Sequence, residues 1–199
     1  MKLYRANIRL SQKIFSILGV FEIVLRNAID THYKTQFLAT TGNTEWLLSQ
    51  MNPGGYLTSR GCHKSLQTVQ DAYNTLSRQT TYTHDKLVAE LSFGFWRFQF
   101  ASKEFRAAGS TLHLIFITRP RGTNHTDIFN KLGDINKLRN RIAHHEPICF
   151  GPGSMISTMY AHQHYNYINE LITWLGYSPD EIFYGIDHVQ IEIDKLNRI

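Results

Sequence analysis

The sequence predicts an all-α fold, with residues 1–199 forming a single domain of bundled helices. Apolar residues recur at three- and four-residue spacing along most of the chain, which is the pattern of amphipathic helices. Helix-start signals punctuate this pattern, such as Thr83 ahead of an acidic turn and the pair Ser178-Pro179. Hydrophobic residues make up 42% of the chain, which is enough to give such helices a common core.

The first segment, residues 2–37, is expected to form one long helix or two continuous ones, because only Gly19 interrupts its apolar periodicity. Within it Glu22, Arg26 and Asp30 are spaced four residues apart and therefore share one helix face. On spacing alone such a ladder is a set of solvated ion pairs, each of which contributes a few tenths of a kcal/mol.

Residues 40–61 lack this periodicity and predict a loop-rich insertion, with a short helix around Trp46. An aromatic stretch over 93–100 follows later, and we expect it to be core rather than a base-stacking surface, because large rings are mostly buried. The other helices are expected over 63–78, 83–91, 107–120, 126–145 and 154–176, with one more starting at Pro179.

The stretch of greatest functional interest closes the helix expected over 126–145. It reads Lys137-Leu138-Arg139-Asn140-Arg141-Ile142-Ala143-His144-His145-Glu146-Pro147. Pro147 disfavours a helical conformation at the residue before it, so the helix should end at His145 or just before. Arg139 and His144 lie five residues apart, on neighbouring faces of a helix.

These residue types suit cleavage of a phosphodiester. The planar fork of Arg139 can hold two phosphate oxygens, and Asn140 can orient a phosphate or an imidazole. Histidine side chains serve as general acids and bases, so His144 can take a proton from a nucleophile or give one to a leaving oxygen. In RNA the 2′-hydroxyl is the nucleophile, so neither a metal nor a protein nucleophile is required. The structural alternative is that these cations simply favour the negative end of a helix.

The sequence Arg139-Asn140, followed by His144, resembles the R-N-x-x-x-H form of the motif of HEPN ribonucleases. Residues 138–147 resemble the Abi-like, abortive-infection branch of that family. Residues 21–29 and 91–96 are also similar to that family, in the family's order. The resemblance implies a helical HEPN fold and a metal-independent endoribonuclease of phage defence. It implies catalytic roles for Arg139, Asn140 and His144. Supporting roles are expected for His145, Glu22, Arg26 and Asn27, and RNA contacts for Lys137, Arg141, Arg119 and Arg121.

Charge and composition limit the partners. The net charge of +5 permits an acidic partner such as RNA. Cys62 and Cys149 form no paired motif, and the histidines lack metal-ligand spacing, so neither a cofactor nor a metal is expected. No apolar run is long enough to span a membrane, and a cytoplasmic protein is expected. A homodimer is also expected, because one histidine does not easily serve as both acid and base. An antitoxin, RNA or protein, would restrain such an enzyme. The alternative is a non-catalytic module that binds RNA or a nucleotide.

Overall fold

The computed structural model describes residues 2–151 and 155–198. This part of the chain is built from α-helices and two short 3-10 helices, and its only extended pairing is an isolated bridge between Phe150 and Ile156. The all-α prediction is therefore confirmed. None of the helices described is long and apolar enough to cross a membrane.

Helix α1, Lys2–Thr41, runs without a break for 40 residues, as the periodicity predicted. Its apolar stripe is fully buried, with Leu10, Ile14, Leu25 and Ile29 among the residues that have no exposed surface. Burial of a leucine or isoleucine side chain contributes about 1.5–3 kcal/mol. The packing of this stripe, rather than helix propensity, therefore holds so long a helix in place.

The chain divides into two compact units. Unit 1 comprises residues 1–24, 116–120 and 131–199, and unit 2 comprises residues 25–115 and 121–130. Two helices, α1 and α7 (His125–Ala143), contribute residues to both units. Each unit has buried residues of its own and is described separately below.

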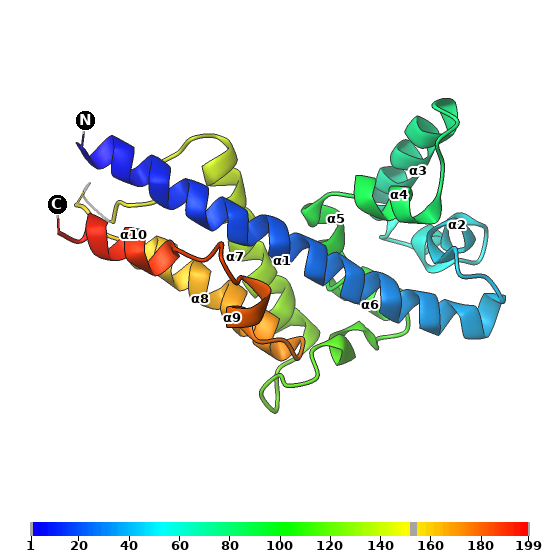
Figure 1. The fold of residues 1–199 in the computed structure, drawn as a ribbon. Coiled ribbons are helices and arrows are strands. Elements are labelled where there is room, and N and C mark those ends of the chain that lie inside the picture. The colour runs from blue at the N-terminus through cyan, green and yellow to red at the C-terminus, as the bar shows by residue number, and fades with distance from the viewer. Residues whose placement is uncertain (1, 152–154, 199) are drawn as a thin grey trace. The chain divides into compact units, whose positions relative to one another are not determined.

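Unit 1 packs the first half of α1 with α7, α8 (Met159–Trp174), α9 (Pro179–Ile182) and α10 (Val189–Leu196) (Figure 1). Leu132, Ile135 and Leu138 of α7 and Ile168 and Leu171 of α8 are fully buried. Polar contacts join segments that are distant in sequence: the Ile148 N–H donates to Asn7 Oδ1 at 2.9 Å, and Arg9 Nε lies 3.3 Å from Glu192 Oε2. The motif at the end of α7 therefore belongs to unit 1.

Unit 2 surrounds the second half of α1 with short helices, drawn from cyan to green in Figure 1. They are α2 (Trp46–Met51), η1 (Tyr56–Thr58), α3 (His63–Arg78), α4 (His84–Glu90), α5 (Phe93–Phe98), α6 (Ser102–Ala107) and η2 (Leu112–Ile115). The predicted insertion over 40–61 holds α2 and η1, and its rings join the core: Phe37 and Tyr56 stack with centroids 5.7 Å apart. The aromatic stretch over 93–100 is core as predicted, except that the Phe98 side chain is exposed.

Two predicted helices were wrong in extent. The helix expected over 107–120 is only η2, because Gly109 and Ser110 have positive φ angles of 95° and 60° that break the helix before it. Helix α8 begins at Met159, not 154, because the chain first folds back on itself. There the Ser157 N–H donates to the Cys149 carbonyl at 2.9 Å. The predicted starting residue, Ser154, lies outside the described residues.

Candidate active site

Helix α7 ends in a Schellman turn that fixes both histidines of the motif. The His145 N–H donates to the Ile142 carbonyl at 3.1 Å, and the Glu146 N–H donates to the Arg141 carbonyl at 2.8 Å. His145 occupies the left-handed position of this turn, with φ +57°. Glycine is the usual residue there, because a Cβ in this region costs roughly 1–2 kcal/mol. The chain therefore keeps an imidazole where a helix end ordinarily has no side chain.

The Arg141 side chain braces this turn. Its Nε lies 3.3 Å from Glu146 Oε2, and its Nη2 donates to the Pro147 carbonyl at 2.8 Å. Its guanidinium carbon also lies 4.9 Å from the centre of the Tyr160 ring on α8. Arg141 thus stabilises the chain reversal after α7, and its predicted contact with RNA stays a prediction.

Arg139 and Glu22 are brought together by the packing of α7 against α1. Arg139 Nε lies 3.3 Å from Glu22 Oε1, with 38% and 29% of the two side chains exposed. A pair this accessible to solvent contributes about 1 kcal/mol or less to stability. A guanidinium carries five N–H donors, so it can hold an acceptor such as a phosphate in addition to this carboxylate. The two sequence-predicted residues therefore form one oriented cation.

The other motif residues lie on the same helix end and are exposed. Lys137, Asn140 and His144 all face solvent, and Lys137 pairs with Asp134 at 2.8 Å. The His144 N–H donates to the Asn140 carbonyl at 2.9 Å, which continues the helical hydrogen bonding one residue past Ala143. The predicted end of the helix is therefore confirmed. Both imidazoles are accessible to a substrate.

An open pocket of about 830 Å³ lies between the first half of α1 and the end of α7. His145 is on its wall, whereas His144 is not among the residues that line it. Tyr4, Ile8 and Phe15 of α1 form much of the opposite wall, and all three are partly exposed. These residues were not predicted as part of a site, because the apolar periodicity of α1 indicates a core-facing helix and its charged ladder lies further along, at Glu22.

Of the other predicted residues, Arg119 belongs to unit 1, and Arg26, Asn27 and Arg121 belong to unit 2. Arg26 and Asn27 belong to unit 2, where Arg26 Nε donates to Asn27 Oδ1 at 3.5 Å. Arg121 is also part of unit 2 and is exposed. Arg119 is part of unit 1 and donates to the Phe116 carbonyl at 3.0 Å.

The position of Arg119 within unit 1 follows from its neighbour Thr118. The Thr118 N–H donates to the Trp174 carbonyl at the end of α8. Lys131 near the start of α7 also contacts the Trp174 ring, so this segment lies at the opposite end of α7 from the motif. The structure therefore does not bring Arg119 to Arg139 and the histidines.

The histidines of α8 take no part in a metal cluster. His164 is buried, and its Nδ1 lies 2.7 Å from the Tyr160 carbonyl, so the ring donates a proton there. Burial lowers the pKa of His164, which favours the neutral ring. Across residues 2–151 and 155–198, no group of three or more His, Cys, Asp and Glu side chains is arranged to hold a metal ion.

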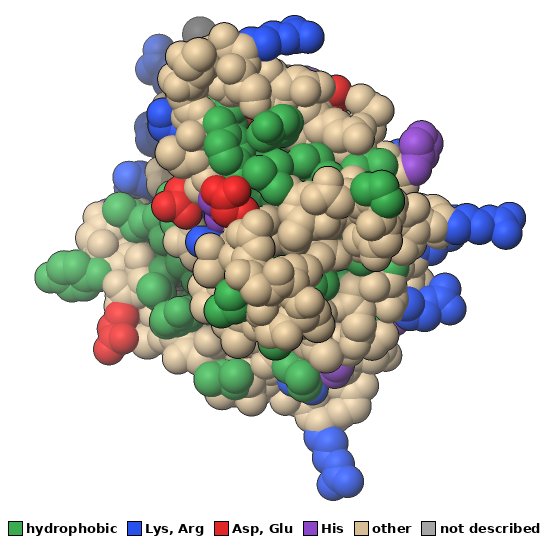
Figure 2. All heavy atoms as spheres, turned by 90° about the vertical axis from the view of Figure 1, so that its right-hand side faces the viewer, with side chains coloured by type: hydrophobic (Ala, Val, Ile, Leu, Met, Phe, Trp, Pro, Cys, Tyr) green, Lys and Arg blue, Asp and Glu red, His purple; other side chains and the backbone are tan. Residues whose placement is uncertain are grey.

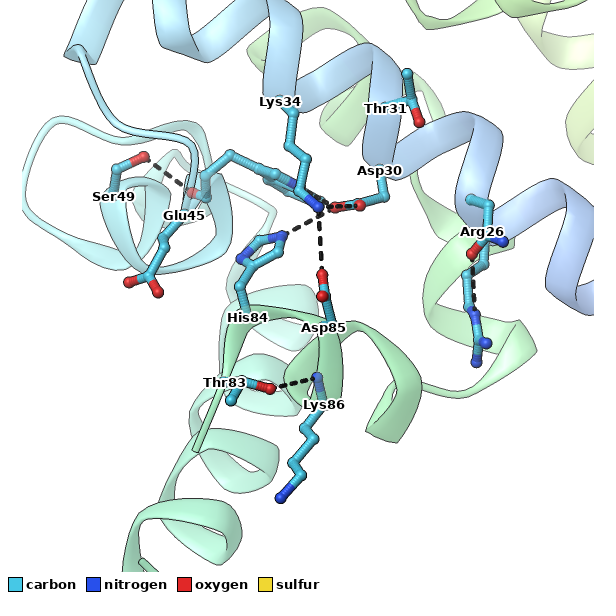
Figure 3. Close-up of polar contacts among 12 residues, drawn as sticks. Arg26, Asp30, Thr31, Lys34, Glu45, Ser49, Thr83, His84, Asp85 and Lys86 are labelled. Carbon is cyan, nitrogen blue, oxygen red and sulfur yellow. Dashed lines mark hydrogen bonds and ion pairs between the residues drawn. The ribbon is translucent and has the colours of Figure 1, made fainter. Parts of the chain in front are cut away.

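A second polar cluster lies in unit 2 around Asp30, which the sequence indicated only as a member of the charged ladder on α1 (Figure 3). The buried Asp30 carboxylate accepts hydrogen bonds from Trp46 Nε1 at 2.8 Å and His84 Nε2 at 2.9 Å, and pairs with Lys34 at 2.8 Å. This carboxylate ties α1 to α2 and α4. Its partners on three helices satisfy the buried carboxylate, so we assign the cluster a structural role.

Figure 2 shows how charged side chains lie on one face of the molecule. On the face drawn in Figure 2, acidic, histidine and cationic side chains meet at one place, and the other Lys and Arg side chains lie along the margin. The described residues of this face therefore present no continuous cationic surface for a phosphate chain.

Comparison with known proteins adds no relative: no protein-family model, no curated protein and no solved structure matches the chain. A function can therefore be inferred only from the chemistry of the residues at the end of α7.

Proposed function

We propose that the chain is a metal-independent endoribonuclease of the HEPN type, and that the end of α7 is its active site. One observation carries the proposal. Arg139, oriented by Glu22 through Nε, lies on the same exposed helix end as the imidazoles of His144 and His145. A cation and two imidazoles on one exposed helix end, with His145 on the wall of an open pocket, supply the charge stabilisation and the proton transfer that RNA cleavage requires.

The reaction balances without a cofactor. A histidine takes the proton from the 2′-hydroxyl, and the 2′-oxygen forms a bond to phosphorus while the bond from phosphorus to the 5′-oxygen breaks. A second acid returns a proton to that 5′-oxygen. Arg139 neutralises the charge that the phosphate oxygens gain in the transition state. The products are a 2′,3′-cyclic phosphate and a 5′-hydroxyl.

The group that acts as the second acid determines whether the active enzyme is a single chain or a homodimer. Glu146 is paired with Arg141, and Glu22 with Arg139, which leaves His145 as the best acid within the same chain. A homodimer with facing motifs would instead supply a second Arg139 and His144, and twofold pairing is the commonest oligomer geometry. We favour the homodimer, as the resemblance to HEPN ribonucleases implies.

Alanine variants test the assignment. Arg139→Ala and His144→Ala should remain folded, because both side chains are at least partly exposed, while RNA cleavage falls by about two orders of magnitude or more. His162→Ala is the matched control, an exposed histidine of α8 in the same unit. Wild-type cleavage by folded His144→Ala would refute its role, and loss only in His145→Ala would transfer that role to its neighbour.

Mixed subunits separate the shared site from the one-chain site. Wild-type protein is mixed with increasing His144→Ala protein, and the oligomeric state is measured by sedimentation at micromolar concentration. A shared site predicts that activity falls faster than the wild-type fraction. A fully active monomer, or a strictly proportional fall, would refute the dimer.

The biological setting follows from the resemblance alone. An Abi-like ribonuclease would act in the cytoplasm as a phage-defence toxin, restrained by an antitoxin of RNA or protein. The alternative function, a non-catalytic module for RNA or a nucleotide, uses the same exposed cation. It predicts RNA binding that Arg139→Ala weakens, together with no cleavage by the wild-type protein.

A further inference from the structure

The first half of α1 has three faces, and only one of them is buried. Successive residues turn by about 100° around an α-helix, so residues three and four apart share a face. Leu10, Ile14 and Ile17 form the buried face. The second face lines the open pocket, with Tyr4, Asn7, Ile8, Ser11, Gln12 and Phe15. The third face is basic, with Lys2, Arg5, Arg9 and Lys13.

The pocket wall mixes exposed rings with amides and hydroxyls. Tyr4 and Phe15 are 64% and 52% exposed, which is unusual for large aromatic side chains. Asn7 is only 8% exposed, and its Oδ1 accepts the Ile148 N–H at 2.9 Å. Because this contact fixes the orientation of the amide, its Nδ2 group is a preset donor for a ligand in the pocket.

The adjoining basic face gives the pocket a charged border. Residues 2–21 contain four cations and no acidic residue, and the first carboxylate of α1 is Glu22. Arg9 pairs with Glu192 of α10 at 3.3 Å. Lys2 and Arg5 are exposed and Lys13 is half-buried. A cationic border beside exposed rings is the combination by which proteins hold single strands, where the cations follow the phosphates and the bases stack on the rings.

We propose that this pocket is a binding groove for single-stranded RNA, namely the part of the substrate that flanks the cleaved phosphodiester. The assignment rests on the proposed function for its ligand. His145 lies on the wall of the groove and at the end of the motif helix, so a strand in the groove leads its backbone to the motif. Tyr4 and Phe15 stack bases, and Asn7 donates to a base acceptor.

Charge favours RNA over a second copy of the chain as the occupant. A second copy seated in this groove would bring its own four cations of α1 against the same border, whereas the homodimer proposed above pairs the motif ends of α7. Like charges brought together in this way oppose association. An RNA strand, in contrast, gains affinity because the cations of the basic face replace its condensed counterions, which are released to the solution.

Binding is measured by fluorescence anisotropy with a fluorescein-labelled 16-nucleotide single-stranded RNA of mixed sequence, fully 2′-O-methylated so that it cannot be cleaved. The decisive variant is Tyr4→Leu/Phe15→Leu, which keeps an apolar surface but removes both rings. We expect its affinity to fall about tenfold or more. Tyr184→Leu is the matched control, because Tyr184 is an 88% exposed ring of unit 1 outside this groove, and it should bind as the wild type does.

A second variant tests the basic border. Arg5→Gln/Lys13→Gln should reduce the slope of log affinity against log salt by about 1.4, since each phosphate contact on a single strand contributes about 0.7. Unchanged affinity in the double leucine variant would overturn the groove. If the affinity of that variant were unchanged and the protein shifted from dimer to monomer, this face would instead be an interface between copies.

The experiments give different results if the proposed RNA groove is wrong and if the proposed ribonuclease activity is wrong. If wild-type protein cleaves unmodified RNA but the double leucine variant binds normally, only the groove is refuted. If the leucine variant loses binding while wild-type protein cleaves no RNA, the groove stands and the ribonuclease is refuted.

Discussion

Replacing His145 with glycine should stabilise the protein while it harms the proposed site. His145 has φ +57°, in the left-handed region, and its side chain is exposed. An L-residue in that region costs roughly 1–2 kcal/mol, which glycine avoids. Glycine also loses more backbone entropy on folding, by about 0.5–1 kcal/mol. The midpoints of the two ranges differ by about 0.75 kcal/mol, so we expect a net gain of that size in the free energy of unfolding, within limits of about 0 and 1.5 kcal/mol.

The neighbouring histidine is the matched control for this prediction. His144 has a negative φ and its N–H continues the helical hydrogen bonds, so His144→Gly gains nothing from the left-handed region. Only the entropic loss remains, and the free energy of unfolding should fall by about 0.5–1 kcal/mol. Two adjacent substitutions to the same residue are therefore expected to have opposite signs.

Scanning calorimetry and urea unfolding measure both variants. For a chain of this size, 1 kcal/mol corresponds to a change in Tm of about 2–4 °C, which both methods resolve. A His145→Gly protein that is no more stable than His144→Gly would refute the reasoning about the turn. Higher stability combined with weaker RNA cleavage would indicate that the imidazole is kept for function at a cost in stability.

Further predictions concern the carboxylates. Asp30→Ala leaves Trp46 and His84 without their acceptor, so urea unfolding should show a loss of about 3 kcal/mol or more, whereas Asp85→Ala, with its side chain 90% exposed, should change stability by about 0.5 kcal/mol or less. Burial raises the pKa of the Asp30 carboxyl, but hydrogen bonds from His84, Lys34 and Trp46 outweigh it and hold the pKa below its ordinary value of 3.8. The stabilisation from Asp30 is therefore complete above about pH 4 and is lost as pH falls through the lowered pKa, and unfolding of Asp30→Ala measured over this range should lack that loss. Glu22→Gln should lower kcat/KM for RNA by less than Arg139→Ala does, because the glutamine keeps an acceptor that can orient the guanidinium; an equal loss would mean that Glu22 itself transfers a proton.

The sequence predicted the parts of the fold that depend on local signals. Helix α3 spans His63–Arg78 as its periodicity indicated. Thr83 caps α4, with its hydroxyl accepting the Lys86 N–H at 3.2 Å. Both results need only a few neighbouring residues. The helix expected over 107–120 failed for a local reason too, since Ser110 gives no warning in the sequence of its positive φ.

The candidate site was predictable only in part. The motif residues are contiguous, so their common helix end could be foreseen, and the pairing of Arg139 with Glu22 was expected only in outline. The Asp30 cluster joins residues 54 positions apart in sequence, which no periodicity encodes. The pocket beside His145 was missed, although the run of cations on α1 before the first acid is a signal that would have drawn attention to it.

The most direct test of the central claim is cleavage of an end-labelled RNA in EDTA, beside the same RNA with a single 2′-deoxy residue at the cleaved position. We expect wild-type protein to cut the unmodified RNA into fragments with 2′,3′-cyclic phosphate and 5′-hydroxyl ends. The RNA with the 2′-deoxy residue should stay intact at that position. Cleavage of the deoxy position at a similar rate, or cleavage that requires a divalent ion, would contradict it.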